Sequence, residues 1–218
     1  MKVFKFIIIM LSIIFAIGYA IAFYHTVQDV DLHQPSDKFF LIGFAVYIPL
    51  WFIWFKRHHF YSTFEHEFTH LIVGLMFFKK PAGFQASETG NGVTYMYGNN
   101  FIITLAPYFL PTFVYLLLPL YLVLDARFYQ YYFAVLGVLT SYHVFSTWQE
   151  FGFHQTDITK SGKTFSCIFL TFANIFIYGV LIAFVIGGFK NSWFFIKNGF
   201  FASYEWMIFV FNFVKGLF

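Results

Sequence analysis

The chain is built from apolar runs that are long enough to cross a lipid bilayer and are separated by short polar links. A helix rises about 1.5 Å per residue and the hydrocarbon core is about 30 Å thick, so about 20 apolar residues span it. Inside the bilayer each backbone N–H and C=O needs a partner within the protein, which favours helices. We therefore expect an all-α polytopic membrane protein with about six transmembrane helices, at 4–24, 39–55, 60–78, 101–124, 131–151 and 165–188.

The composition agrees with this interpretation. Hydrophobic residues make up 60% of the chain and charged residues 11%, with a mean hydropathy of +0.70, so a soluble domain could not cover its core with polar surface. The net charge of +3 is small, and the Lys and Arg in short loops are topology signals and not a nucleic-acid patch. The single cysteine, Cys167, excludes an internal disulfide. We expect one membrane-embedded domain over residues 1–218.

Both ends of the chain allow two interpretations. The run at 4–24 has a basic start and small residues near its end, as in a signal peptide, but it is long enough to span and we favour an uncleaved helix. The run at 199–214 contains Glu205 and is either a short seventh helix or a helix in the interface. The loop charges slightly favour a cytoplasmic N-terminus.

The third run contains His66-Glu67-Phe68-Thr69-His70, an HExxH motif. On a helix, two His four residues apart lie on one face, so both imidazoles reach one Zn²⁺. Glu67 then lies beside the open coordination position, where it can take a proton from the attacking water. The alternative is a polar helix turn whose side chains pair with neighbouring groups, but such groups are costly in a membrane helix and are usually functional. We predict a zinc hydrolase site with His66 and His70 as ligands and Glu67 as general base.

The segment after the motif is not membrane-helical. Asn91-Gly92 is a hairpin turn signal, and Val93, Thr94 and Tyr95 favour a strand. We predict a short β-hairpin over 84–97 near the metal. Val93, Thr94 and Tyr95 would form an edge strand that holds the substrate through main-chain bonds. The alternative is a solvated loop far from the metal.

The order of these elements resembles a known family. An early HExxH helix, a Gly-containing polar hairpin, a bent helix and a late Asp are similar to the site-2-protease-like intramembrane zinc metalloproteases, above all their small bacterial branch. The resemblance covers about residues 60–187, and it implies Zn²⁺, two His ligands, a Glu base and a third, carboxylate ligand. The matching stretches are the motif, Gly90-Asn91-Gly92-Val93-Thr94-Tyr95, and Gln155-Thr156-Asp157-Ile158 leading into Lys160-Ser161-Gly162.

The resemblance assigns the third ligand to Asp157. The Asn-Pro-x-x-Asp-Gly sequence of better-known members is absent here. If every helix from the motif onward crosses the bilayer, Asp157 emerges on the opposite side, but the three prolines of 101–124 favour a broken segment that does not cross. If neither a break nor an internal cavity brings Asp157 back, the other candidates are His143, Glu150 and Glu88.

We expect a membrane-embedded zinc metalloendopeptidase that hydrolyses peptide bonds of membrane proteins within or near the bilayer. Its partners would be a membrane-protein substrate and lipid, and the bacterial branch implies the bacterial inner membrane. One alternative is a non-catalytic relative that binds membrane segments without cutting them. Another is a di-iron membrane oxidase, which needs more His-rich boxes, because only His143 and His154 follow His70.

Overall fold

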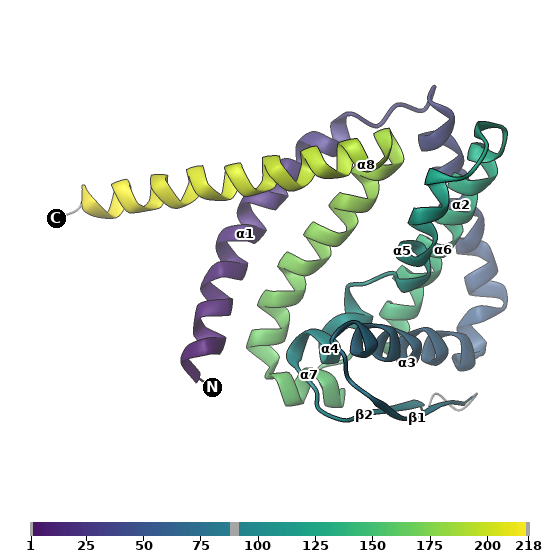
Figure 1. Cartoon of the computed structure of the whole chain (residues 1–218), viewed down its shortest axis with the longest axis horizontal. Coiled ribbons are helices and arrows are strands. Elements are labelled where there is room, and N and C mark those ends of the chain that lie inside the picture. The colour runs from purple at the N-terminus through teal and green to yellow at the C-terminus, as the bar shows by residue number, and fades with distance from the viewer. Residues whose placement is uncertain (1, 88–91, 217–218) are drawn as a thin grey trace. The chain divides into compact units, whose positions relative to one another are not determined.

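The computed structural model describes residues 2–87 and 92–216, and of Lys2, Tyr95 and Met96 it describes the backbone alone. The described chain is mostly helical and contains one two-stranded antiparallel sheet (Figure 1). It forms two compact units, one of residues 1–31 with 163–218 and one of residues 32–162. Each unit is described in turn.

The first unit consists of two long helices, α1 (Lys2–Gln28) and α8 (Lys163–Lys215). α8 is broken at Gly187 and Gly188, whose backbone is not helical. Gly188 has a φ of 64°, a conformation that glycine adopts without strain. Tyr19 of α1 and Phe195 of α8 belong to the apolar core of this unit.

The two apolar runs predicted near the C-terminus lie in two helical arms that Gly187 and Gly188 separate. The first run, 165–188, forms the arm before the break and ends at these glycines, and residues 199–214 lie in the arm after it. The hydroxyl of Ser192, just after the break, donates to the carbonyl of Val180 in the first arm at 3.0 Å. This bond joins the two arms close to the bend.

The second unit contains a pair of helices, α2 (Pro35–Ile53) and α6 (Tyr129–Glu150), which pack side by side. The 3₁₀ turn η4 (Ala126–Phe128) leads into α6. Two glycines allow the close approach: a Cβ on Gly43 would lie 1.9 Å from the carbonyl oxygen of Ala134, and a Cβ on Gly137 2.0 Å from that of Phe40. Small residues at such crossings let helix backbones meet in membrane proteins.

The motif helix, α3 (His59–Met76), follows the 3₁₀ turn η1 (Phe55–Arg57). In Figure 1, α3 runs across the ends of α2 and α6 instead of lying beside them. The motif therefore lies at one end of the α2–α6 pair. The sequence predicted that residues 60–78 cross the bilayer beside the neighbouring helices. The observed direction of α3 differs from that prediction.

A hairpin of β1 (Pro81–Ala86) and β2 (Gly92–Met96) packs on α3. The predicted hairpin covered 84–97, and the observed one begins three residues earlier, at Pro81. The strands are antiparallel and pair Phe84 with Thr94 and Ala86 with Gly92. Gly92 is therefore a strand residue, and the prediction of Asn91-Gly92 as the turn is wrong for Gly92. Asn91 lies outside the described residues.

The proline-containing segment after the hairpin is sharply bent. Its first half is α4 (Phe101–Leu105) with η2 (Ala106–Tyr108), and its second half is α5 (Thr112–Leu117) with η3 (Leu118–Leu122). The two halves meet at 93°. Pro107 and Pro111 explain the break, since a proline cannot donate the main-chain bond that continues a helix. A short helix, α7 (Thr156–Ser161), follows α6.

Three helices are long and apolar enough to cross a membrane, namely Val3–Gln28 in α1, Pro35–Ile53 and Lys163–Lys215. The bent pair Phe101–Tyr108 and Thr112–Leu122 would make a fourth if it counts as one span. Within residues 2–87 and 92–216, α3 and α6 do not meet this criterion, because polar side chains interrupt their apolar sequence. The expected count of six transmembrane helices is not confirmed.

Candidate metal centre

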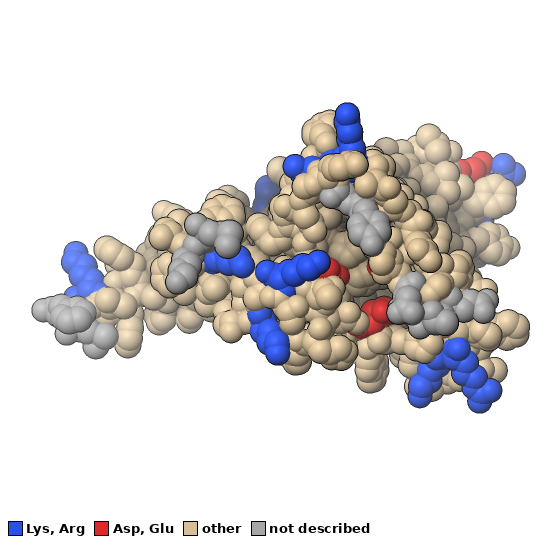
Figure 2. Space-filling model, turned by 90° about the horizontal axis from the view of Figure 1, so that it is seen from below, with Lys and Arg blue, Asp and Glu red and all other residues tan. Residues whose placement is uncertain are grey.

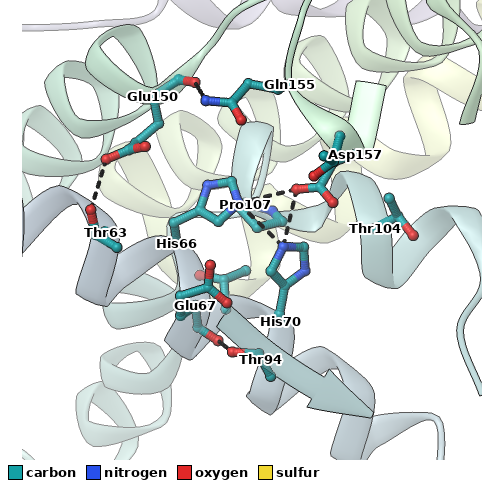
Figure 3. Close-up of polar contacts among 12 residues, drawn as sticks. Thr63, His66, Glu67, His70, Thr94, Thr104, Pro107, Glu150, Gln155 and Asp157 are labelled. Carbon is teal, nitrogen blue, oxygen red and sulfur yellow. Dashed lines mark hydrogen bonds and ion pairs between the residues drawn. The ribbon is translucent and has the colours of Figure 1, made fainter. Parts of the chain in front are cut away.

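Three side chains converge beside α3 (Figure 3). His66 and His70 lie on successive turns of α3, and Asp157 comes from α7. Nε2 of His66 lies 3.2 Å from Nε2 of His70 and 3.2 Å from Oδ2 of Asp157, and Nε2 of His70 lies 3.3 Å from the same oxygen. The structure thus brings together the three residues proposed from the sequence as metal ligands. Among the described residues, no other group of three His, Cys, Asp or Glu side chains is similarly placed.

α7 holds Asp157 in this position. Ile158 of α7 is fully buried, and α7 packs against α4. Gln155, just before α7, donates from Nε2 to the carbonyl of Glu150 at 3.0 Å. Burial raises the pKa of the Asp157 carboxyl, but its hydrogen bonds with the two His side chains outweigh this and hold the pKa well below its usual range. Asp157 is therefore an ionised carboxylate.

His70 makes a second contact that fixes its tautomer. Its Nδ1 lies 2.8 Å from the carbonyl oxygen of Ile103. Because a carbonyl only accepts hydrogen bonds, Nδ1 carries the proton. Nε2 is therefore the nitrogen that faces His66 and Asp157. When a cation takes the place of the proton on Nε2, two imidazole nitrogens and a carboxylate oxygen meet it at one point, and the cation would stabilise the arrangement.

The spacing of the three atoms fits zinc. In a tetrahedral site with bonds of about 2.0–2.1 Å, the ligand atoms lie about 3.3–3.4 Å from one another. The observed separations of 3.2, 3.2 and 3.3 Å are close to this value. Two imidazoles and one carboxylate, with one side left open, are also the ligand set of many catalytic zinc sites, in which water or substrate takes the fourth position.

Glu67 is buried and lies directly under strand β2. The Thr94 hydroxyl donates to the main-chain carbonyl of Glu67 at 3.0 Å, which fastens the strand to the motif (Figure 3). A Cβ on Gly92 would lie 2.6 Å from Cγ of Glu67 and 2.5 Å from Cγ2 of Thr63. No side chain fits at Gly92 without moving Glu67.

A cavity of about 320 Å³ opens beside the three converging side chains. Figure 2 shows acidic atoms inside a hollow on this face and basic side chains around it. The hairpin contributes Gly92, Val93 and Thr94 to the wall, so two of the three predicted substrate-binding residues border the cavity. The backbone of Tyr95 pairs with Gly83 in the sheet. The other lining residues are Thr63, His66, Glu67, His70, Glu150, Gln155, Thr156, Asp157 and Lys160.

His143 of α6, an alternative ligand, packs against another face of α3. Its Nδ1 is 2.9 Å from Oε1 of Glu65, and the two side chains are 2% and 3% exposed. This pair joins α3 to α6 and does not belong to the group of three converging side chains. Sequence reasoning missed Glu65; its position directly before the motif, in a helix where a carboxylate needs a partner, was the available signal.

The other two alternatives are placed differently. Oε1 of Glu150 accepts hydrogen bonds from the hydroxyls of Ser62 at 2.8 Å and Thr63 at 3.1 Å. Glu150 borders the cavity but does not belong to the group of three. Glu88 lies outside the described residues. The Ile103 carbonyl was also missed, since a main-chain group has no sequence signature of its own.

The geometry is that of a membrane protein with a metallopeptidase-like centre, and comparison with known families agrees. The family described as Peptidase M50B-like matches residues 39–151, more than half of the chain. The chain therefore belongs to this family, which confirms the resemblance to site-2-protease-like proteins. It is an integral membrane protein whose function is related to that of membrane metallopeptidases.

The matched range differs from the one expected. It begins at α2, earlier than residue 60, and it ends before α7, so it includes the HExxH motif but not Asp157. Comparisons with curated proteins and with solved structures gave no match.

Proposed function

We propose that the protein is a membrane-embedded zinc metalloendopeptidase that hydrolyses peptide bonds of membrane proteins within or near the bilayer. One observation carries this proposal: two imidazole nitrogens and a carboxylate oxygen lie at tetrahedral spacing beside Glu67, at the edge of an open cavity. Membership of the Peptidase M50B-like family supports it independently.

His66, His70 and Asp157 would hold the zinc ion. When bound, zinc polarises a peptide carbonyl and makes water more acidic. Glu67 would take the proton of the attacking water and pass it to the nitrogen of the leaving amine. The buried position of Glu67 beneath Gly92 keeps its carboxylate in place for this transfer.

The hairpin would hold the substrate. A transmembrane helix hides its peptide bonds within its own hydrogen bonds, so the chain must be extended before it is cut. β2 pairs with β1 along one edge, and its residues Val93 and Thr94 border the cavity. A substrate strand added along the edge of β2 that faces away from β1 would bond to those main-chain groups of Val93, Thr94 and Tyr95 that point to this side, and it would lie next to the three proposed ligands.

Two alternatives make different demands on this centre. A di-iron oxidase needs a second set of metal ligands near the first, and the described residues place only His66, His70 and Asp157 together. A non-catalytic relative needs the hairpin but no zinc. Metal analysis of the purified protein distinguishes all three possibilities: zinc, iron or no metal.

The experiment that tests the proposal uses the protein in liposomes with a reporter that carries one transmembrane segment. Glu67→Gln should keep zinc and reduce cleavage by about 100-fold or more, because it removes proton transfer alone. His66→Ala should lose both zinc and cleavage. Glu205→Gln, a glutamate far along α8, is the matched control and should behave as the wild type. Equal zinc loss in the Glu67 and His66 variants would contradict the assigned roles.

We also propose a bacterial inner membrane as the location, with the N-terminus in the cytoplasm. The support is the distribution of Lys and Arg among the loops and the resemblance to the bacterial branch. A reporter fused before Lys2 should be active only in the cytoplasm, and one inserted after Asp31 only outside. The reverse pattern would overturn this orientation.

A further inference from the structure

The partner of His70 is a carbonyl group that a regular helix would not leave available. In an α-helix the carbonyl of each residue accepts from the amide four residues later. The amide that would serve Ile103 belongs to residue 107, which is proline and has no N–H. In place of that amide, Nδ1 of His70 lies 2.8 Å from the Ile103 carbonyl oxygen.

The local structure agrees with this account. The amide of Thr104 donates to the carbonyl of Asn100 at 3.0 Å, so α4 is regular at its start. α4 ends at Leu105, and a 3₁₀ turn that contains Pro107 follows. Ile103 is 1% exposed, so water does not replace the missing donor, and a buried carbonyl left alone would be costly.

Pro107 is itself held in place. It is buried, and its carbonyl accepts from the Thr147 hydroxyl of α6 at 3.3 Å. Pro107 and His66 line the same small pocket between α3 and α6. The proline is thus fixed close to one of the proposed ligands and is not only the site of a bend.

We propose that Pro107 is a positioning residue for the metal centre: because it has no N–H, it leaves the Ile103 carbonyl to His70. That bond keeps the proton of His70 on Nδ1 and the lone pair of Nε2 toward His66 and Asp157. The inference rests on the proposed function in so far as this lone pair is to bind zinc. Partners of this kind typically change metal affinity about 10- to 100-fold when they are lost.

The test compares two replacements that differ in one group. Pro107→Ala introduces an N–H that can compete for the Ile103 carbonyl. In the second variant, lactic acid replaces the residue at position 107, so that an ester bond replaces the peptide bond between residues 106 and 107. This ester variant lacks the proline ring, as the alanine variant does, but it has no N–H. Pro119→Ala, at a proline of the same bent segment in η3, is the control for the loss of a proline alone. Zinc affinity is measured by competition with a chelator, and the His70 tautomer by ¹⁵N magnetic resonance of the zinc-free protein.

Pro107→Ala should bind zinc about 10-fold or more weakly and show His70 with the proton distributed over both nitrogens. The ester variant and Pro119→Ala should keep the wild-type affinity and the Nδ1–H form. Equal weakening in the alanine and ester variants would assign the effect to the ring and overturn the inference, as would an unchanged affinity in both.

Two further outcomes are also decisive. If the wild type binds no zinc, the proposed function fails, but the His70 signals still decide the inference: the same tautomer in all variants would overturn it. If Pro107→Ala does not fold, the ester variant decides alone. Wild-type affinity and tautomer in the ester variant support the inference, and loss of either overturns it.

Discussion

Two groups of His and carboxylate side chains join α3 to its neighbours, one to α7 and one to α6, and they differ in their surroundings. His66, His70 and Asp157 are 12–20% exposed and border a cavity. Glu65 and His143 are 2–3% exposed and enclosed between α3 and α6. The two groups lie on different faces of α3.

The comparison indicates why the open group is the candidate metal site. In the enclosed pair, one ring nitrogen of His143 meets one carboxylate oxygen of Glu65. In the open group, His70 already uses its N–H on Ile103, and its other nitrogen meets a carboxylate and a second imidazole. The open side and the convergence of two imidazole nitrogens on one carboxylate, and not the residue types, distinguish the open group.

The largest expected effect is on the open group. Asp157→Ala should reduce zinc affinity by more than about 100-fold, beyond the loss typical of outer-shell partners, and should abolish cleavage. Zinc per protein is measured after dialysis against a weak chelator. Asp125→Ala, which removes an exposed aspartate paired with Arg127, should retain zinc. Retention of zinc by the Asp157 variant would remove the distinction between the two groups.

The enclosed pair should respond in the opposite way. Glu65→Ala leaves His143 buried without its carboxylate, which should lower the free energy of unfolding by about 3–5 kcal/mol. Zinc bound per folded molecule should stay at the wild-type level. Unfolding in detergent with and without zinc gives both quantities, and Glu65→Ala combined with His143→Ala measures their coupling. A loss of zinc without a loss of stability would place Glu65 in the metal centre.

A smaller effect is expected where β2 approaches the general base. Gly92→Ala introduces a Cβ that meets Cγ of Glu67 at 2.6 Å, so the carboxylate must move. Misplacement of a catalytic group by about 1 Å costs roughly 100-fold in rate, while zinc content should be unchanged. Gly216→Ala, where the added Cβ meets only ordinary contacts at 3.5 Å, is the control. An unchanged cleavage rate would show that the position of Glu67 is not limiting.

The smallest expected effect concerns the outer edge of β2. Thr94→Pro and Tyr95→Pro each remove one main-chain donor, and Thr94→Pro also removes the hydroxyl that donates to the Glu67 carbonyl. Because neighbouring residues of a strand alternate, only one of the two amides faces the substrate side. That variant should lower kcat/KM by about 10-fold, roughly the value of one hydrogen bond, with normal zinc content. Full activity in both variants would mean that the substrate is held elsewhere.

Much of the site could be predicted from the sequence, because it depends on local geometry. Helical spacing places His66 and His70 on one face whatever the rest of the chain does. The strand character of Val93 and Thr94 likewise follows from residue type. Asp157 came from the resemblance, since nothing local relates it to a motif 87 residues earlier.

The rest depended on packing between distant elements. The length of an apolar run does not say whether a helix lies beside its neighbours or across their ends, so the direction of α3 and the number of spans could not be read from 60–78. The close approach of α2 and α6 depends on Gly43 and Gly137, whose partners become known only in three dimensions. The partner of His70 is a main-chain carbonyl, and Pro107 was its only trace in the sequence.

If the protein is the proposed peptidase, the transverse course of α3 has a consequence for which part of a substrate would be cut. The cavity is bordered by Glu150, the last residue of α6, and by α7 beyond it, so the cutting level lies at the end of a helix and not at its middle. The terminal turn of any helix lacks part of its internal hydrogen bonds, and detaching it is easier than opening the centre. With the proposed cytoplasmic N-terminus, α3 lies at the cytoplasmic end of α2, so a chain severed at this level would keep its anchor in the lipid and release its cytoplasmic part with only a short apolar stub.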